Sequence, residues 1–197
     1  IFALILICSM HPEPVVALAP DAGEIGKIRG SGVLERNGAV ITGGSGVGVK
    51  SMDTAVTAKG TMQIDFVDET RVDITEHSRL LIDEFVYDPN SDRGSLSLKA
   101  SLGTVRYASG QIAKNSAQNI SIKTPTATVS VRGTDFAMTI DEIGSSTIIL
   151  LPSCDGNGNC FVGEIVVESD AGQVIMNQAF QATQVDTPQS TPLKPVL

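Results

Sequence analysis

Residues 61–74 read TMQIDFVDETRVDI and contain two runs in which apolar and polar side chains alternate. Met62 and Ile64 are apolar members of the first run, and Val72 and Ile74 are those of the second. Successive side chains of a β-strand point to opposite faces, so a period of two places one face in a core and the other in water. The stretch therefore predicts two half-buried strands.

The same alternation recurs along the chain, separated by turn-forming sequences at 88–91, 109–110 and 155–156. Only residues 111–118 have the composition of a short helix. Many short strands at regular spacing predict an all-β single domain, built as a β-solenoid or roll or as a sandwich, because these folds share one alternation. The other alternating apolar residues are Leu96, Leu98, Ile120, Ile122, Val129, Val131, Phe136, Met138 and Ile140.

The domain boundaries follow from changes in composition. Residues 147–151 form a nearly continuous apolar run, typical of a strand covered on both faces. We expect the β domain to cover 23–185. Residues 186–197 are rich in proline, which cannot donate to a strand ladder, so they are expected to form an extended, flexible tail.

The N-terminal segment has the pattern of an export signal. Residues 1–10 form an apolar run that is too short to span a bilayer, and Ala17-Leu18-Ala19 has the small-residue pattern of a signal-peptidase site. We therefore predict a signal-peptide remnant at 1–19, with a buried N-terminal strand as the alternative. Export would place the domain in the periplasm or cell envelope, with membrane contact only through this signal or anchor.

The charge balance argues against nucleic acid as a partner. The chain has 14 Lys and Arg against 22 Asp and Glu, a net charge of -8. Nucleic-acid binding needs a basic surface that displaces counterions from phosphates. The acidic residues are scattered and are expected to keep the protein soluble.

Two cysteines bracket a turn-forming sequence. Cys154 and Cys160 enclose Asp-Gly-Asn-Gly-Asn, which can fold back tightly enough to bring the sulfurs together. A disulfide is plausible in an oxidising compartment. The alternative is a pair of free thiols at a hairpin tip.

Catalytic and metal-binding constellations are not evident in the sequence. His77 stands alone without nearby cysteines, so it cannot complete a zinc site, and no Gly-x-Ser-x-Gly sequence accompanies it as a nucleophile. A surface histidine in a turn is the preferred interpretation. The acidic residues that could pair for glycoside hydrolysis are interpreted as solvated strand faces, given only 4% aromatics. They are Asp65, Asp68, Glu69, Asp73, Asp83 and Glu84.

Two loops resemble ligand-binding motifs without matching them. In residues 43–51 Val49 separates the last glycine from Lys50, whereas a P-loop needs them adjacent, so a flexible loop is predicted. Residues 155–159 begin like a calcium loop but have Cys160 where it needs glycine, which favours an ordinary turn. We therefore predict no enzyme activity, no catalytic residues, no metal, no cofactor and no small-molecule substrate.

Residues 123–136, KTPTATVSVRGTDF, resemble the most recognisable motif of the FecR domain family, a TPTA segment followed by Arg-Gly-Thr-Asp/Glu-Phe. Residues 26–32 and 52–57 are similar to two other segments of that family. Residues 66–70 resemble its Asp-Gly-Thr turn, with Glu69 in place of the usual glycine. The resemblance covers about Gly23 to Val167.

The motif has both a structural and a binding interpretation. We expect Gly133 to allow a backbone conformation or a close strand approach that a side chain would block. Arg132 can fork to a carboxylate and tie two layers together, with Asp135 the nearest acidic residue in sequence. Alternatively Arg132 binds a carboxylate of a partner. The candidate binding or structural residues are Thr124, Pro125, Arg132, Gly133, Thr134, Asp135 and Phe136.

The resemblance implies a non-catalytic domain with protein partners in the cell envelope, acting as a binding or scaffolding module. Two alternatives remain open. The segment 143–183 looks similar to stand-alone FecR-like proteins of marine bacteria and their tailed phages, which suggests a virion structural protein. The family also includes periplasmic sensor domains of sigma-factor regulatory systems.

Overall fold

The computed structural model describes residues 21–91 and 93–197. The predicted signal-peptide remnant at 1–19 lies outside the described residues. The described chain is almost entirely β-structure in one domain, which confirms the predicted all-β fold. The strands are β1 (Gly23–Arg36), β2 (Ala39–Thr42), β3 (Gly48–Val49), β4 (Thr54–Phe66), β5 (Arg71–Ile74), β6 (Arg79–Asp88), β7 (Arg93–Ala108), β8 (Ile120–Lys123), β9 (Thr128–Arg132), β10 (Asp135–Ile140), β11 (Ser146–Leu151), β12 (Ser153–Cys154), β13 (Cys160–Phe161), β14 (Glu164–Ser169), β15 (Gly172–Met176) and β16 (Ala182–Val185).

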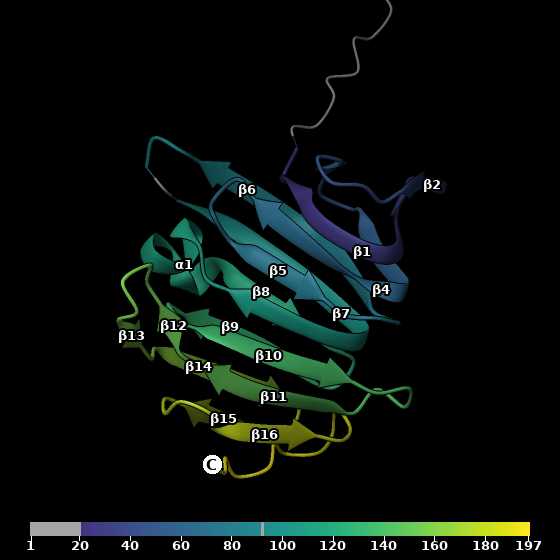
Figure 1. Ribbon diagram of the computed structural model, residues 1–197. Helices are drawn as coiled ribbons and strands as arrows, with labels where there is room; N and C mark the ends of the chain where they lie inside the picture. The colour runs from purple at the N-terminus through teal and green to yellow at the C-terminus, as the bar shows by residue number, and fades with distance from the viewer. Residues whose placement is uncertain (1–20, 92) are drawn as a thin grey trace, which may run out of the picture.

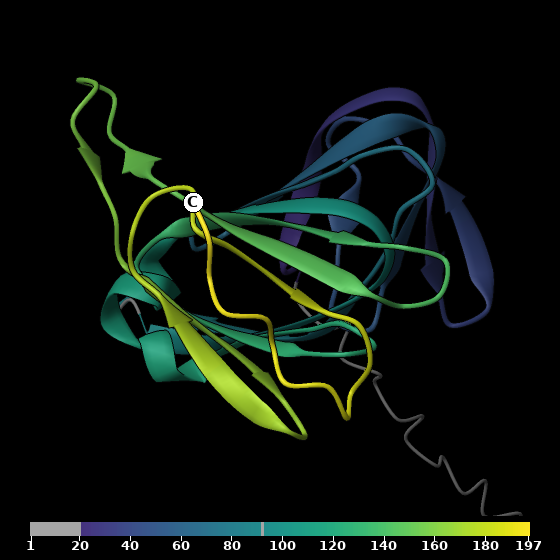
Figure 2. The same cartoon turned by 90° about the horizontal axis from the view of Figure 1, so that it is seen from below.

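Three long strands, β1, β4 and β7, each pass through two layers of the sheet (Figures 1 and 2). In the first layer the order is β15-β14-β9-β8-β7-β6-β4-β1-β2. In the second layer it is β16-β11-β10-β7-β5-β4-β1-β3. All pairs are antiparallel except β7 with β8. The fold is therefore a rolled sandwich, in which shared bent strands join the layers.

A pair of glycines lies where β1 and β4 pass from one layer to the other. Gly30 pairs with Gly60, next to a register shift between Gly30 and Gly32. Gly30 has a φ of 73°, and a Cβ built on it would lie 2.1 Å from the carbonyl oxygen of Lys59. A Cβ on Gly60 would lie 2.2 Å from the Arg29 carbonyl oxygen. Only glycine tolerates both the conformation and the approach, so the sequence itself allows the bend.

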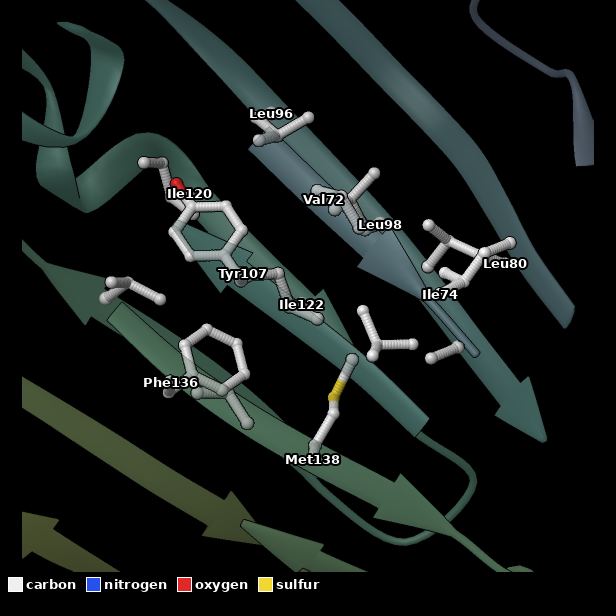
Figure 3. Close-up of a cluster of buried hydrophobic side chains, with 14 of the residues drawn as sticks. Val72, Ile74, Leu80, Leu96, Leu98, Tyr107, Ile120, Ile122, Phe136 and Met138 are labelled. Carbon is white, nitrogen blue, oxygen red and sulfur yellow. The ribbon is translucent and has the colours of Figure 1, made fainter. Parts of the chain in front are cut away.

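The core lies between the layers and consists mainly of aliphatic side chains. Leu98 and Ile122 come from the first layer, and Ile74 and Met138 from the second; all four are buried (Figure 3). The alternation predicted from the sequence thus corresponds to the buried faces. Each large apolar side chain that is fully buried contributes roughly 1.5–3 kcal/mol to the free energy of folding. The packing of the two layers against each other is therefore the main source of stability.

A short helix closes one end of the roll. Helix α1 (Gln111–Asn115) and the 3-10 turn η1 (Ala117–Asn119) occupy the segment predicted as helical. The Asp68 carbonyl oxygen accepts the Gln111 N–H at 2.7 Å, and its carboxylate accepts the Ile112 N–H at 3.2 Å. Asp68 therefore satisfies N–H groups that the first turn of a helix leaves without partners. It is buried, which differs from its expected place on a solvated strand face.

The C-terminal tail runs beside the edge strands β15 and β16, at the bottom of the view in Figure 1. The Leu193 N–H donates to the Gln184 carbonyl at 2.9 Å, and Val196 pairs with Ala182 in both directions. The Pro188 carbonyl accepts the Asp170 N–H at 2.9 Å. In the structure the tail is hydrogen-bonded to both layers, whereas the sequence predicts an extended, flexible tail. Its prolines leave enough N–H donors between them to pair with β16.

Candidate functional site

The TPTA segment forms a turn that is tied to the start of β11. The Thr124 hydroxyl oxygen accepts the Ala127 N–H at 2.9 Å. The Ser146 hydroxyl donates to Thr124 at 2.8 Å and accepts from Thr126 at 2.8 Å. The Pro125 ring lies near Gly144, where an added Cβ would be 3.2 Å from it. These side chains hold the turn between the layers.

The Arg-Gly-Thr-Asp-Phe segment lies at the other end of β9, so the two halves of the motif do not form one site. Gly133 has a φ of 60°, in the left-handed region that favours glycine. No atom lies within 4 Å of a Cβ placed there, so the conformation rather than crowding requires glycine. The Thr134 hydroxyl donates to the Leu151 carbonyl at 3.0 Å, and its own carbonyl accepts the Ser109 hydroxyl at 2.6 Å.

Asp135 is the polar centre of this end. Its carboxylate accepts the Ser153 hydroxyl at 2.5 Å and the Ser109 N–H at 3.2 Å, and Arg106 donates to it at 3.3 Å. It is buried, and buried carboxylates need such partners. Three segments distant in sequence therefore meet at this one side chain.

Arg132 does not pair with Asp135. Its guanidinium donates to Glu164 at 2.8 Å, and its side chain is 68% exposed. Arg132 and Glu164 are opposite each other in the β9–β14 ladder, so they belong to the same layer. The expectation that Arg132 ties two layers through Asp135 is therefore replaced by an exposed cross-strand pair. Binding of a partner's carboxylate by Arg132 stays a prediction.

Phe136, the last motif residue, belongs to the core. Its ring stacks on Tyr107 with centroids 5.4 Å apart (Figure 3). Both side chains are buried, and burial raises the pKa of the Tyr107 hydroxyl above its ordinary value. The stack joins β10 to β7 beside the Asp135 network.

The disulfide predicted as one alternative is present in the structure: Cys154 and Cys160 are bonded. They close a hairpin, β12–β13, that forms its own two-stranded sheet and stands away from the two layers (Figure 2). At its tip the Asp155 carboxylate accepts the N–H groups of Asn157 at 2.8 Å and Asn159 at 2.9 Å. The calcium-like sequence is thus a turn stabilised by its own aspartate.

A pocket of about 270 Å³ lies between the motif turn, the connection from β7 to α1 with the last turn of α1, and this hairpin. We call it the Gly133 pocket. Its lining residues are Ala108, Ser109, Lys114, Gly133, Asp135, Ser153, Cys154, Asp155 and Phe161. Sequence reasoning found Gly133, Asp135 and the cysteines separately, and only the fold brings them together. Thr124 and Pro125 line a different, more polar depression with Glu168 and Pro188.

The remaining sequence candidates are dispersed. His77 lies exposed in a turn with a φ of 53°. The glycine-rich loop connects β2 to β3 and is held by the Gly43 N–H on the Gly32 carbonyl at 2.9 Å. In 21–91 and 93–197 no group of three or more His, Cys, Asp or Glu residues is placed to hold a metal ion. No helix in this part of the chain is both long and apolar enough to cross a bilayer.

The sequence profile described as FecR protein matches residues 53–151, just over half of the chain. The chain belongs to the FecR family. The matched region begins at Asp53 and ends with β11, so it contains both halves of the motif but stops before the disulfide hairpin.

Solved structures share the FecR fold of this chain. Two crystal structures of a putative anti-sigma factor from Parabacteroides distasonis ATCC 8503, at 1.65 and 2.50 Å resolution, superpose with TM-scores of 0.50 and 0.52. Each is 14% identical and covers 70% of this chain, which spans 56% of the solved chain. At this identity the likeness concerns the fold alone. No curated protein matches the sequence.

Two further FecR segments contain buried aspartates whose role the sequence did not reveal. Asp53 is fully buried and is bound by Arg36 and by the Lys50 N–H at 2.8 Å. Asp68 precedes Glu69, the departure from the family's Asp-Gly-Thr turn. Glu69 has a φ of 68°, so this position does adopt the conformation that glycine favours. In the sequence, the only sign that Asp53 and Asp68 would accept buried hydrogen bonds was that each is a polar residue beside a predicted turn.

Proposed function

We propose that this FecR-family chain is an exported, non-catalytic domain that binds another protein at the cell envelope. The observation that carries the proposal is that the motif side chains bond within the fold, whereas other side chains stay exposed at the surface. The motif residues Thr124, Thr134 and Asp135 are hydrogen-bonded within the fold. Their engagement supports a structural role for the motif and leaves recognition to exposed groups.

Exposed apolar side chains support a protein partner. Val40 on β2, Ile143 in the β10–β11 turn, Phe161 on the hairpin and Ile175 on β15 are each at least half exposed. Apolar and aromatic residues at a surface are the usual anchors of protein interfaces. β2 and β15 are also the outer strands of the first layer. The bond between Cys154 and Cys160 supports export, since disulfides persist in oxidising compartments.

Photo-crosslinking in the native cells tests the proposal. A benzophenone amino acid replaces Val40, Ile143, Phe161 or Ile175 one at a time, with the exposed Lys59 as the polar control. We expect an adduct with an envelope protein from at least one apolar position and none from Lys59. An absence of adducts at all four positions would overturn protein binding.

The location of the protein is tested separately. Mass spectrometry of the mature protein from fractionated cells reports its N-terminus and compartment. We expect a start near Pro20 in the periplasmic or envelope fraction. A protein recovered from the cytoplasm with reduced cysteines would contradict export without affecting the protein-binding proposal.

A second candidate is the periplasmic sensor part of a sigma-factor regulatory system. The FecR family and the fold shared with a putative anti-sigma factor favour it. Deletion of the gene would then change transcription of one discrete set of promoters in the presence of the inducing signal. An unchanged transcript profile would reject this candidate and leave a scaffolding role. A virion role stays a prediction from sequence resemblance, and its test is the presence of the chain in purified particles.

A further inference from the structure

The β12–β13 hairpin holds an aromatic side chain away from the core. Phe161 is 54% exposed, and its neighbour Val162 is also exposed. The hairpin lies C-terminal to the region that the family profile matches. Adjacent exposed apolar side chains on a projecting element form a small apolar patch, and such a patch is a surface that a protein partner can cover.

The hairpin is fixed in place at both ends. The disulfide closes it, and the Asp155 carboxylate organises its tip. At its base Ser153 donates to Asp135 of the family motif at 2.5 Å. An isolated two-stranded hairpin is marginal in water, so these attachments preorganise Phe161 before any partner arrives.

The Gly133 pocket beside Phe161 has the size of a protein anchor site. Its volume of about 270 Å³ is below the roughly 300–1,000 Å³ of small-molecule pockets. Phe161 and Ala108 supply apolar walls, and the bare backbone of Gly133 leaves the floor open. A single large side chain inserted into such a pocket is typical of an interface hot spot.

The charges around the pocket restrict the partner. Asp155 is an exposed carboxylate, and the hydrogen bonds from Asn159 hold its pKa below the ordinary value. Lys114 lies in the lining as a single cation. The chain as a whole carries a net charge of -8, so a basic partner segment is attracted and an acidic one is repelled.

We propose that Phe161 and the Gly133 pocket bind a segment of a partner protein that presents one large apolar side chain beside a basic residue. The inference rests on the proposed protein-binding function and names its surface. A second apolar groove, lined by Val67, Phe85 and Val86, lies beside Asp21, where the described chain begins. Nothing among the described residues shows what covers that groove.

Nuclear magnetic resonance with defined peptides tests the proposal. The probes are capped peptides GKFKG, GEFEG and GKAKG, added to the full oxidised chain labelled with ¹⁵N. We expect GKFKG to shift the amide signals of Gly133, Asp155 and Phe161. GKAKG lacks the large apolar side chain, and GEFEG carries acidic residues in place of basic ones. Each should bind at least about fivefold more weakly than GKFKG, since loss of a hot-spot contact costs more than about 1 kcal/mol and like charges repel.

Three variants separate this surface from others. Phe161→Ser should abolish the GKFKG shifts, whereas Val40→Ser, a matched loss of an exposed apolar side chain on β2, should leave them unchanged. Cys154→Ser with Cys160→Ser should weaken them by releasing the hairpin. Preserved signals elsewhere in the spectrum confirm that each variant folds.

Some outcomes would overturn the docking site alone. The docking site would be rejected if GKAKG gave shifts as large as those of GKFKG, or if GEFEG gave larger ones. It would also be rejected if the GKFKG shifts survived in Phe161→Ser. Photo-crosslinks from Val40, Ile143 or Ile175 in the absence of any from Phe161 would leave protein binding intact and place it on another surface. Failure of every crosslink would instead reject the proposed function.

Discussion

Arg36 and Asp53 form a two-point ion pair that joins the end of β1 to the turn before β4. The Arg36 Nε donates to one carboxylate oxygen at 2.7 Å, and Nη2 donates to the other at 2.6 Å. Asp53 is fully buried, while the Arg36 side chain is 27% exposed. The same guanidinium donates to the Gly48 carbonyl at 2.8 Å, so it also fixes β3. The geometry satisfies both carboxylate oxygens, as a buried charge requires.

Arg36→Met should lower the free energy of unfolding by about 3 kcal/mol, because it leaves the Asp53 carboxylate buried without its cation. Urea denaturation measures the change. The matched control is Arg71→Met, which breaks a pair with Asp65 at 2.8 Å whose side chains are both more than a third exposed. Exposed pairs contribute at most about 1 kcal/mol. Equal losses in the two variants would contradict this account.

Glu69→Gly should stabilise the protein by about 1 kcal/mol. Glu69 has a φ of 68°, a conformation that costs a side-chain-bearing residue roughly 1–2 kcal/mol and that glycine adopts freely. Part of the gain is offset by loss of the Gln111 hydrogen bond to Glu69 at 2.6 Å. Gly133→Ala is the reverse test, since Gly133 has a φ of 60° and open space around it. In thermal unfolding the midpoint temperature should rise for Glu69→Gly and fall for Gly133→Ala. A change of the same sign in both variants would refute the role assigned to φ.

Thr183→Val should loosen the C-terminal tail. The buried Thr183 hydroxyl donates to the Leu193 carbonyl at 2.6 Å, and valine keeps its shape without the donor. We expect a loss of about 1 kcal/mol and faster hydrogen exchange at Leu193 and Val196. Thr139→Val, which removes an exposed hydroxyl of β10, should leave exchange in the tail unchanged. Unchanged exchange in Thr183→Val would show that the tail is held by other contacts.

Lys99→Met should raise the pKa of Asp83. The Lys99 ammonium donates to Asp83 at 2.7 Å and holds its pKa below the ordinary value of 3.8. A carboxyl whose pKa is lowered by folding stabilises the protein above its unfolded pKa, and this contribution is lost as the pH falls through the folded pKa. The difference in stability between wild type and variant should therefore be present above pH 3.8 and disappear below it.

Carboxyl titration by nuclear magnetic resonance checks the assignment. Asp88 is an internal control, because its lowered pKa comes from Ser91 and Asn90 rather than from a lysine. The pKa of Asp88 should not change in Lys99→Met. A pKa of Asp83 that also stays low would assign the effect to Ser97, which donates to it at 3.1 Å.

Several features could be predicted from local sequence. Met62, Ile64 and the other alternating residues are buried because the two-residue period is a property of each strand alone. The composition of residues 111–118 likewise predicts a short helix, because helix propensity is also a local property of a segment. Arg132 shows the limit of this reasoning: Asp135 is close in sequence, but the β9–β14 register puts Glu164 opposite Arg132.

By itself, the sequence determined the all-β class and the family resemblance. These follow from composition, spacing and side-chain period, which need no partner strand. The tertiary structure alone decided the rolled sandwich, the separation of the TPTA turn from Gly133, and the pocket between Asp135 and Phe161. Each depends on which strands pair across long sequence separations, and that choice is made by the energy of the whole core rather than by any one segment.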